Sequence, residues 1–154
     1  MGGNGSYSKE FRGVPLASRT HIDTNMRIDG HKVLLQRKNA KQSKNIMNSN
    51  SESPIYILAR VKDDGTVVVH SVNVYKGHEI NLEINLKYDI HGNIIPYSKG
   101  SAKGSHAHKW YIDETGKFAR MQHDATNVFD IPPEYDELIR HIDEFNKGKH
   151  KWKK

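Results

Sequence analysis

Apolar and polar side chains alternate strictly along "INLEINLKY" (80–88), and this pattern constrains the fold more than any other part of the chain. Successive side chains of a β-strand point to opposite faces of the sheet. The segment therefore predicts a strand with one buried face and one polar face. Such one-sided strands are typical of antiparallel sheets, which need a second layer to cover the apolar face.

Further β-rich segments surround this strand and are separated by the turn signals "DDG", "KGH" and "HGN". They lie at 30–38, 54–61, 66–75, 105–113 and 117–123, with a short edge strand expected at 94–97. The short spacing predicts an antiparallel meander of five to seven strands within residues 31–129.

Residues 130–147 change to helical periodicity. Asp130 is the expected N-cap, and Lys147 with Gly148 forms a stop signal. The apolar positions at helical spacing are Tyr135, Leu138, Ile139, Ile142 and Phe145. We expect this helix to pack on the apolar face of the sheet, in a single α+β domain of residues 1–154.

The net charge of +6 is unevenly distributed. Residues 1–50 carry nine basic and three acidic residues, residues 147–154 carry five lysines, and the middle of the chain is acidic. We interpret 1–30 as an extended basic arm and 148–154 as a basic tail. Basic ends suit a polyanion such as RNA, although lysine-rich tails are also common as solvated surface.

Several classes of protein are excluded or disfavoured by composition. The chain has no cysteine, so disulfides, thiolate catalysis and cysteine zinc sites are excluded. It has no apolar run long enough for a transmembrane helix, and its first residues do not resemble a secretory signal. We expect a protein of the bacterial cytoplasm without membrane partners.

The stretch "GSHAHKW" (104–110) places two of the ten histidines two residues apart. Strand alternation puts His106 and His108 on the same face. A two-residue turn at 115–116 would set His108 opposite His123 on the return strand, whereas a three-residue turn would set it opposite Gln122.

The shorter turn is favoured because it keeps Ala119 and Met121 on the same face as Trp110 and Ile112. The position of Phe118 argues for the longer turn. Under the favoured register, three imidazoles converge at the open end of the sheet.

Three imidazoles at one place allow different chemistries, and the sequence leaves the choice open. As ligands, His106, His108 and His123 could hold zinc or another divalent metal and leave one position open. Without a metal, two histidines could transfer protons in RNA cleavage while Lys109, Arg120 or a lysine of "SKGSAKG" stabilises the transition state. The histidines could also be ordinary surface residues.

The opening "MGGNGSY" resembles the glycine-rich openings of small phage and mobile-element proteins and the junctions of phage head-associated (MuF-type) toxins. Domains after such junctions resemble the barnase–EndoU–RelE nuclease group, which keeps a helix before the sheet, whereas the clearest helix here follows it. The resemblance implies a small ribonuclease toxin that needs no cofactor and has an immunity protein as partner. The residues that could fill its site are His106, His108, Lys109, Arg120, His123 and Thr126.

Two other functions fit the same sequence. One is a phage-encoded inhibitor that binds a host defence complex through its basic arm and tail. The other is a metal-dependent hydrolase built on the histidine cluster.

Overall fold

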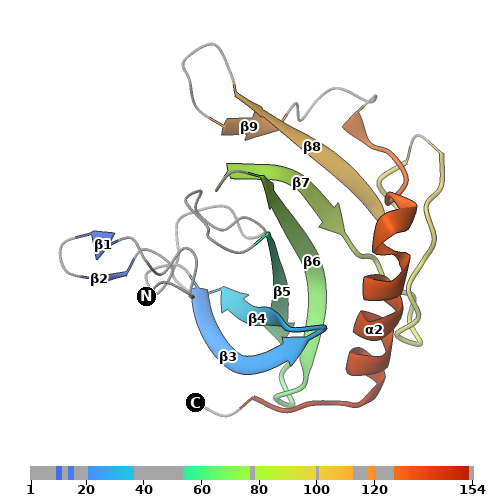
Figure 1. Cartoon of the computed structure of the whole chain (residues 1–154). Coiled ribbons are helices and arrows are strands. Elements are labelled where there is room, and N and C mark those ends of the chain that lie inside the picture. Colours follow the sequence, from blue (N-terminus) through green and yellow to red (C-terminus); the bar gives the residue numbers. More distant parts are fainter. Residues whose placement is uncertain are drawn as a thin grey trace.

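A computed structural model describes residues 10–11, 14–15, 21–36, 54–76, 79–99, 101–112, 118–120 and 127–152. A seven-stranded sheet dominates the fold, and one helix lies along the outer side of its curve (Figure 1). The strands, in their order across the sheet, are β3 (His21–Ile28), β4 (His31–Gln36), β5 (Ile55–Val61), β6 (Val67–Lys76), β7 (Glu79–Asn85), β8 (His106–Ile112) and β9 (Phe118–Arg120). Two short strands, β1 (Glu10–Phe11) and β2 (Val14–Pro15), form a separate hairpin.

The predicted α+β class is confirmed, with a strand meander and a helix packed on one face. The exception to the antiparallel order is β4, which pairs with β5 in parallel. A parallel pair needs a crossover connection, and most of the segment that joins these two strands lies outside the described residues. The expected edge strand at 94–97 is reduced to an isolated bridge between Tyr88 and Ile94.

The sheet begins at His21, within the segment that was predicted to be an arm up to residue 30. Two features hide this strand from pattern analysis. The pairing of β3 with β4 shifts between Asp23 and Arg27, and Asn25 has a positive φ of 64°. The irregularity breaks the two-residue period that identifies a strand.

The helix begins later than predicted. A 3-10 turn, η3 (Pro133–Tyr135), precedes α2 (Asp136–Lys147), so Asp130 is not its N-cap. Pro132 has a ψ of 138° because the residue before a proline is driven out of the helical region. The predicted end at Lys147 and Gly148 is confirmed. No helix within the described residues is long and apolar enough to cross a membrane.

One core cluster contains the apolar side chains of β7 and those of α2, as the alternation of the strand and the periodicity of the helix predict. Leu82 is only 5% exposed. The predicted residues found in this cluster are Leu82, Ile84, Leu86, Leu138, Ile139, Ile142 and Phe145. The side chain of Ile80 lies outside the described part of the structure.

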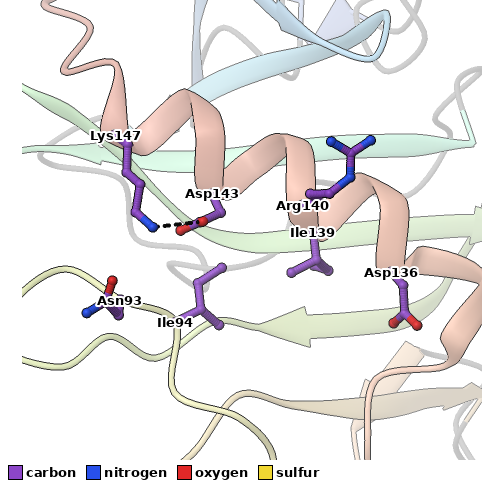
Figure 2. Close-up of a pocket in the computed structure, with 7 residues that line it drawn as sticks. All are labelled: Asn93, Ile94, Asp136, Ile139, Arg140, Asp143 and Lys147. Carbon is purple, nitrogen blue, oxygen red and sulfur yellow. Dashed lines mark hydrogen bonds and ion pairs between the residues drawn. The ribbon is translucent and has the colours of Figure 1, made fainter.

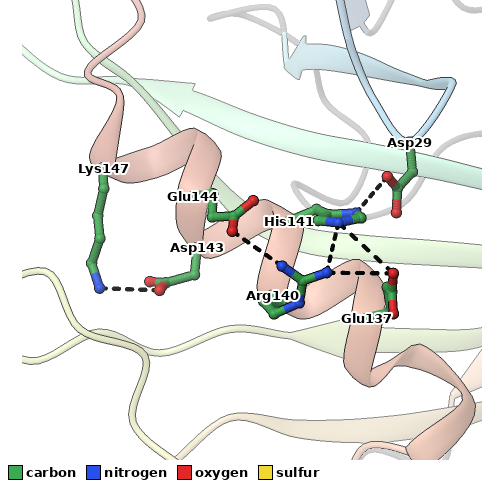
Figure 3. A network of polar contacts seen from close by, with 7 residues as sticks. All are labelled: Asp29, Glu137, Arg140, His141, Asp143, Glu144 and Lys147. Atoms are coloured by element: carbon green, nitrogen blue, oxygen red, sulfur yellow. Dashed lines mark hydrogen bonds and ion pairs between the residues drawn. The ribbon is translucent and has the colours of Figure 1, made fainter.

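Polar contacts also fasten the helix to the sheet. Asn146 accepts a hydrogen bond from the backbone N–H of Val69 and donates to the Tyr88 hydroxyl, which donates to the Val69 carbonyl. Figure 3 shows a second attachment, in which His141 contacts Asp29 of the β3–β4 turn. These contacts hold α2 at both the middle and the edge of the sheet.

The end of the chain belongs to the fold as far as residue 152. Trp152 donates its backbone N–H to the Gly65 carbonyl, and Lys151 forms an ion pair with Asp64. The segment predicted as a basic tail, 148–154, is therefore docked on the β5–β6 turn over most of its length.

Candidate functional site

Polar side chains occupy the face of the sheet opposite the helix and form two rows across four strands. The first row runs through Leu58, Ser71, Asn85 and His106. The second row runs through Tyr56, Asn73, Glu83 and His108. Most of these polar side chains are buried. Burying polar groups is costly, so such a concentration is typical of a functional site.

His106 and His108 meet at the β8 end of these rows. Their Nε2 atoms lie 3.1 Å apart, and their rings cross at 85°. His106 is 2% exposed and His108 is half-buried. The structure thus brings together the two histidines that strand alternation places on one face.

Hydrogen bonds at the other ring nitrogens define the tautomer of each ring. The Nδ1 of His106 lies 2.8 Å from the Gly104 carbonyl, and the Nδ1 of His108 lies 2.7 Å from the Asn127 carbonyl. A carbonyl can only accept, so each Nδ1 carries a proton. In two neutral rings the facing Nε2 atoms would both be acceptors. The short contact between them is favourable when the pair shares one additional proton.

Asn127 supports His108 from the edge of the sheet. Its side-chain amide accepts from the Lys109 backbone N–H at 2.7 Å and donates to the Lys109 carbonyl at 3.0 Å. The same residue supplies the carbonyl that holds His108. Asn127 is 3% exposed, and nothing in the sequence pattern singled it out as a support for the site.

The residues before the histidines have comparable roles. The hydroxyl of Ser105 accepts from the Lys87 backbone N–H at 3.0 Å. Gly104 packs so closely against Pro96 that a Cβ atom would lie 2.0 Å from the Pro96 carbonyl oxygen. The glycine of "GSHAHKW" is thus required because a larger residue would overlap Pro96. The serine is required because it binds the backbone just after β7.

A pocket of about 290 Å³ opens beside the histidine pair. Its described lining is strongly basic and polar, and it contains no carboxylate. The lining residues are Arg60, His70, Asn85, Leu86, Lys87, Ala102, His106 and His108.

A β-bulge places His70 at this pocket. Ser71 pairs with Leu58 and Val69 pairs with Ala59, so His70 is the additional residue in β6. The bulge reverses the parity of the strand at this point. Unbroken alternation would give His70 the parity of Val72 and Val74, so alternation alone does not identify it as a site residue.

His21 is buried and His70 is half-buried, and both remain neutral at physiological pH. Burial, together with the nearby charges of Arg60 and Lys87, lowers the pKa of His70 to about 3. Burial lowers the pKa of His21 to about 4. A neutral imidazole can donate and accept hydrogen bonds without adding charge.

The other predicted site residues have different positions. Lys109 is exposed and alternates with the histidine pair along β8, so it belongs to the opposite face of the strand. The backbone of Arg120 pairs with Trp110, which gives the register of the three-residue turn and not the favoured two-residue turn. The predicted pairing of His108 with His123 depended on the shorter turn and is not supported. His123 and Thr126 themselves lie outside the described residues.

Metal binding by this site was the alternative use of the histidines. Two Nε2 atoms 3.1 Å apart could occupy neighbouring positions on one divalent ion. Among the described residues, no group of three His, Asp or Glu side chains is arranged to hold a metal. Arg60 and Lys87 line the same pocket, and their positive charges oppose a bound cation.

A larger pocket of about 420 Å³ lies elsewhere, between α2 and residues 93–94 (Figure 2). Its two cations, Arg140 and Lys147, are engaged in ion pairs with carboxylates of the same helix (Figure 3). None of its described lining residues is a histidine. The smaller histidine pocket is therefore the better candidate for chemistry.

Comparisons of the chain with protein-family models, with curated proteins and with solved structures found no match. The candidate function consequently depends on the geometry of the pocket.

Proposed function

We propose that this protein is a small ribonuclease that cleaves RNA by acid–base catalysis at His106 and His108, without a metal. The observation that carries the proposal is the 3.1 Å contact between the two Nε2 atoms, at a pocket lined by cations. The proposal also gives a biological setting. Such an enzyme would act on cellular RNA in the bacterial cytoplasm as a toxin, the role implied by the resemblance of the "MGGNGSY" opening.

A histidine pair with one additional proton contains both groups that the reaction needs. The neutral imidazole removes the proton of a ribose 2′-hydroxyl, whose oxygen then attacks the adjacent phosphorus. The imidazolium donates its proton to the departing 5′-oxygen as the P–O bond breaks. The products are an RNA with a 2′,3′-cyclic phosphate and an RNA with a free 5′-hydroxyl, and the pair keeps the same number of protons.

In-line attack places the attacking and departing oxygens on opposite sides of the phosphorus, so the two Nε2 atoms must separate when substrate binds. His108 is the ring that can turn, because it is half-buried whereas His106 is enclosed. The RNA phosphate would enter between the rings and replace the contact between the two Nε2 atoms. Active-site hydrogen bonds commonly rearrange in this way when substrate binds.

The test compares His106→Ala and His108→Ala with wild type on a single-stranded RNA and on the DNA of the same sequence. Each variant should lose about 100-fold or more of the RNA cleavage rate, because proton transfer contributes about that much. DNA should remain intact since it has no 2′-hydroxyl. A matched control is His91→Ala, because His91 is an exposed turn residue outside the pocket.

A pH profile and a chelation assay complete the test. The cleavage rate should pass through a maximum with pH, since one ring must be neutral and the other charged. Cleavage should be unchanged by EDTA. RNA cleavage that persists in His108→Ala would contradict the proposal, and loss of activity on chelation would favour the metal-dependent alternative.

A further inference from the structure

Two cations at the histidine pocket have no carboxylate partner among the described residues. Arg60 and Lys87 are exposed, and neither forms an ion pair within the described part of the chain. On helix α2 the situation differs, because Arg140 contacts Glu137 and Glu144, and Lys147 contacts Asp143. At the histidine pocket, two cations come together without a carboxylate in the described lining, which makes the pocket suited to an anion.

His70 adds a polar atom that has no partner. Its Nε2 is buried and makes no hydrogen bond in the structure described. Burial is the main cause of the low pKa of His70, and the nearby cations Arg60 and Lys87 contribute to it. All three residues line the same pocket. A buried polar atom without a partner is costly unless a ligand satisfies it.

We propose that Arg60, Lys87 and His70 form a phosphate-binding subsite beside the histidine pair, which takes the sugar–phosphate group of the RNA. This inference rests on the proposed function for the identity of the ligand. The subsite consists of side chains from β5, β6 and the segment just after β7, and the bulge in β6 brings His70 to it.

Phosphate fits this chemistry better than other anions. A guanidinium can bind two phosphate oxygens at once, a lysine supplies a point charge, and a neutral imidazole N–H can donate to a third oxygen. The absence of a carboxylate from the described lining means that nothing there repels the ligand. This proposal gives charge stabilisation to Arg60 and Lys87, whereas the sequence hypothesis gave it to Lys109, Arg120 or a lysine of "SKGSAKG".

The experiment measures binding in the absence of RNA. Wild-type protein is titrated with inorganic phosphate and with a nucleoside 3′-monophosphate, and binding is followed by calorimetry and by NMR shifts of the histidine side chains. Arg60→Gln and Lys87→Gln should each weaken binding about tenfold, because each removes a charge-assisted contact. Both residues are exposed, so these variants should keep the fold.

The control is Lys62→Gln, which removes an exposed lysine outside the pocket and should leave phosphate affinity unchanged. Inorganic phosphate and the nucleoside 3′-monophosphate should also inhibit RNA cleavage competitively. A preference for the nucleoside monophosphate over inorganic phosphate would show that the subsite also contacts the sugar.

The outcomes separate this inference from the proposed function. Phosphate binding that depends on Arg60 and Lys87, in a protein that does not cleave RNA, would support the subsite and overturn the nuclease. RNA cleavage together with phosphate affinity that is identical in Arg60→Gln, Lys87→Gln and wild type would overturn the subsite and leave the nuclease standing.

Discussion

The side-chain amide of Asn127 forms both hydrogen bonds that a neighbouring strand would make with the backbone of Lys109. Asn127 thereby takes the place of a strand residue beside β8, next to the point where its own carbonyl holds His108. The backbone of Phe129 continues this pairing with Ala107. One residue therefore closes the sheet edge and orients a proposed catalytic ring.

Replacing Asn127 should reduce both stability and RNA cleavage. Asn127→Ala leaves two part-buried backbone groups of Lys109 without their side-chain partner, at a cost of up to about 1–3 kcal/mol for each group. Asn127→Asp keeps the shape but directs an oxygen at the Lys109 carbonyl, so it should also destabilise. Urea denaturation measures the effect, with the exposed Asn93→Ala as the control. Stability equal to wild type in Asn127→Asp would contradict the assigned hydrogen bonds.

Substitution of Gly104 should damage the site through packing. In Gly104→Ala, the new methyl group would overlap the Pro96 carbonyl, so the chain must move, and the carbonyl that holds His106 must move with it. Overpacking of this kind costs about 1–3 kcal/mol. The comparison is Gly92→Ala, whose Cβ meets no atom within 4 Å. Because Gly92 has a φ of 82°, that variant should lose about 1 kcal/mol from backbone strain and keep its RNA cleavage rate.

Sequence patterns predicted the parts of the fold that depend on local periodicity. The alternation in β7 and the apolar stripe of α2 were sufficient to identify the core. Alternation in β8 was sufficient to place His106 and His108 on one face. These inferences succeed because neighbouring side chains along a regular element have fixed directions.

The remaining features depend on departures from regular geometry or on distant contacts. The bulge at His70 reverses the parity of β6, and a one-residue change in the β8–β9 turn shifts every pair of that hairpin. Arg60 and Lys87 reach the pocket from other strands, and no local pattern relates them to the histidines. Tertiary structure therefore decides which cations join the site.

The contacts among Tyr88, Asn146 and Val69 should behave as one unit in unfolding experiments. Asn146→Ala removes a partner from the Val69 N–H and from the Tyr88 hydroxyl, so it should cost about 1–3 kcal/mol. Tyr88→Phe removes the bond to the Val69 carbonyl. The double variant should lose less than the sum of the single losses by about 0.5–3 kcal/mol, since the two residues share partners.

A surface ion pair of the same helix provides the contrast. Asp143→Ala removes the partner of Lys147 (Figure 3) and should change the free energy of unfolding by less than about 1 kcal/mol, because exposed ion pairs contribute little. Strict additivity between Tyr88→Phe and Asn146→Ala would contradict a shared network.

Acid should destabilise this protein through His21 and His70, whose pKa values are lowered in the folded state. The folded-state pKa values are about 4 for His21 and about 3 for His70, whereas an unfolded histidine titrates near 6.5. Between about pH 6.5 and these lower values, the unfolded chain binds protons that the folded protein does not. The stabilisation from each histidine is therefore complete above pH 6.5 and decreases as the pH falls, by about 3 kcal/mol at pH 4.

Urea denaturation in phosphate-free buffer at pH 7 and pH 4 measures the loss. His70→Gln should lower stability at pH 7 but reduce the difference between the two pH values, whereas His91→Gln, which changes an exposed residue, should leave that difference unchanged. An identical pH dependence in His70→Gln and wild type would show that the pKa of His70 is not lowered in the folded protein, which would contradict its enclosure beside the two cations of the pocket.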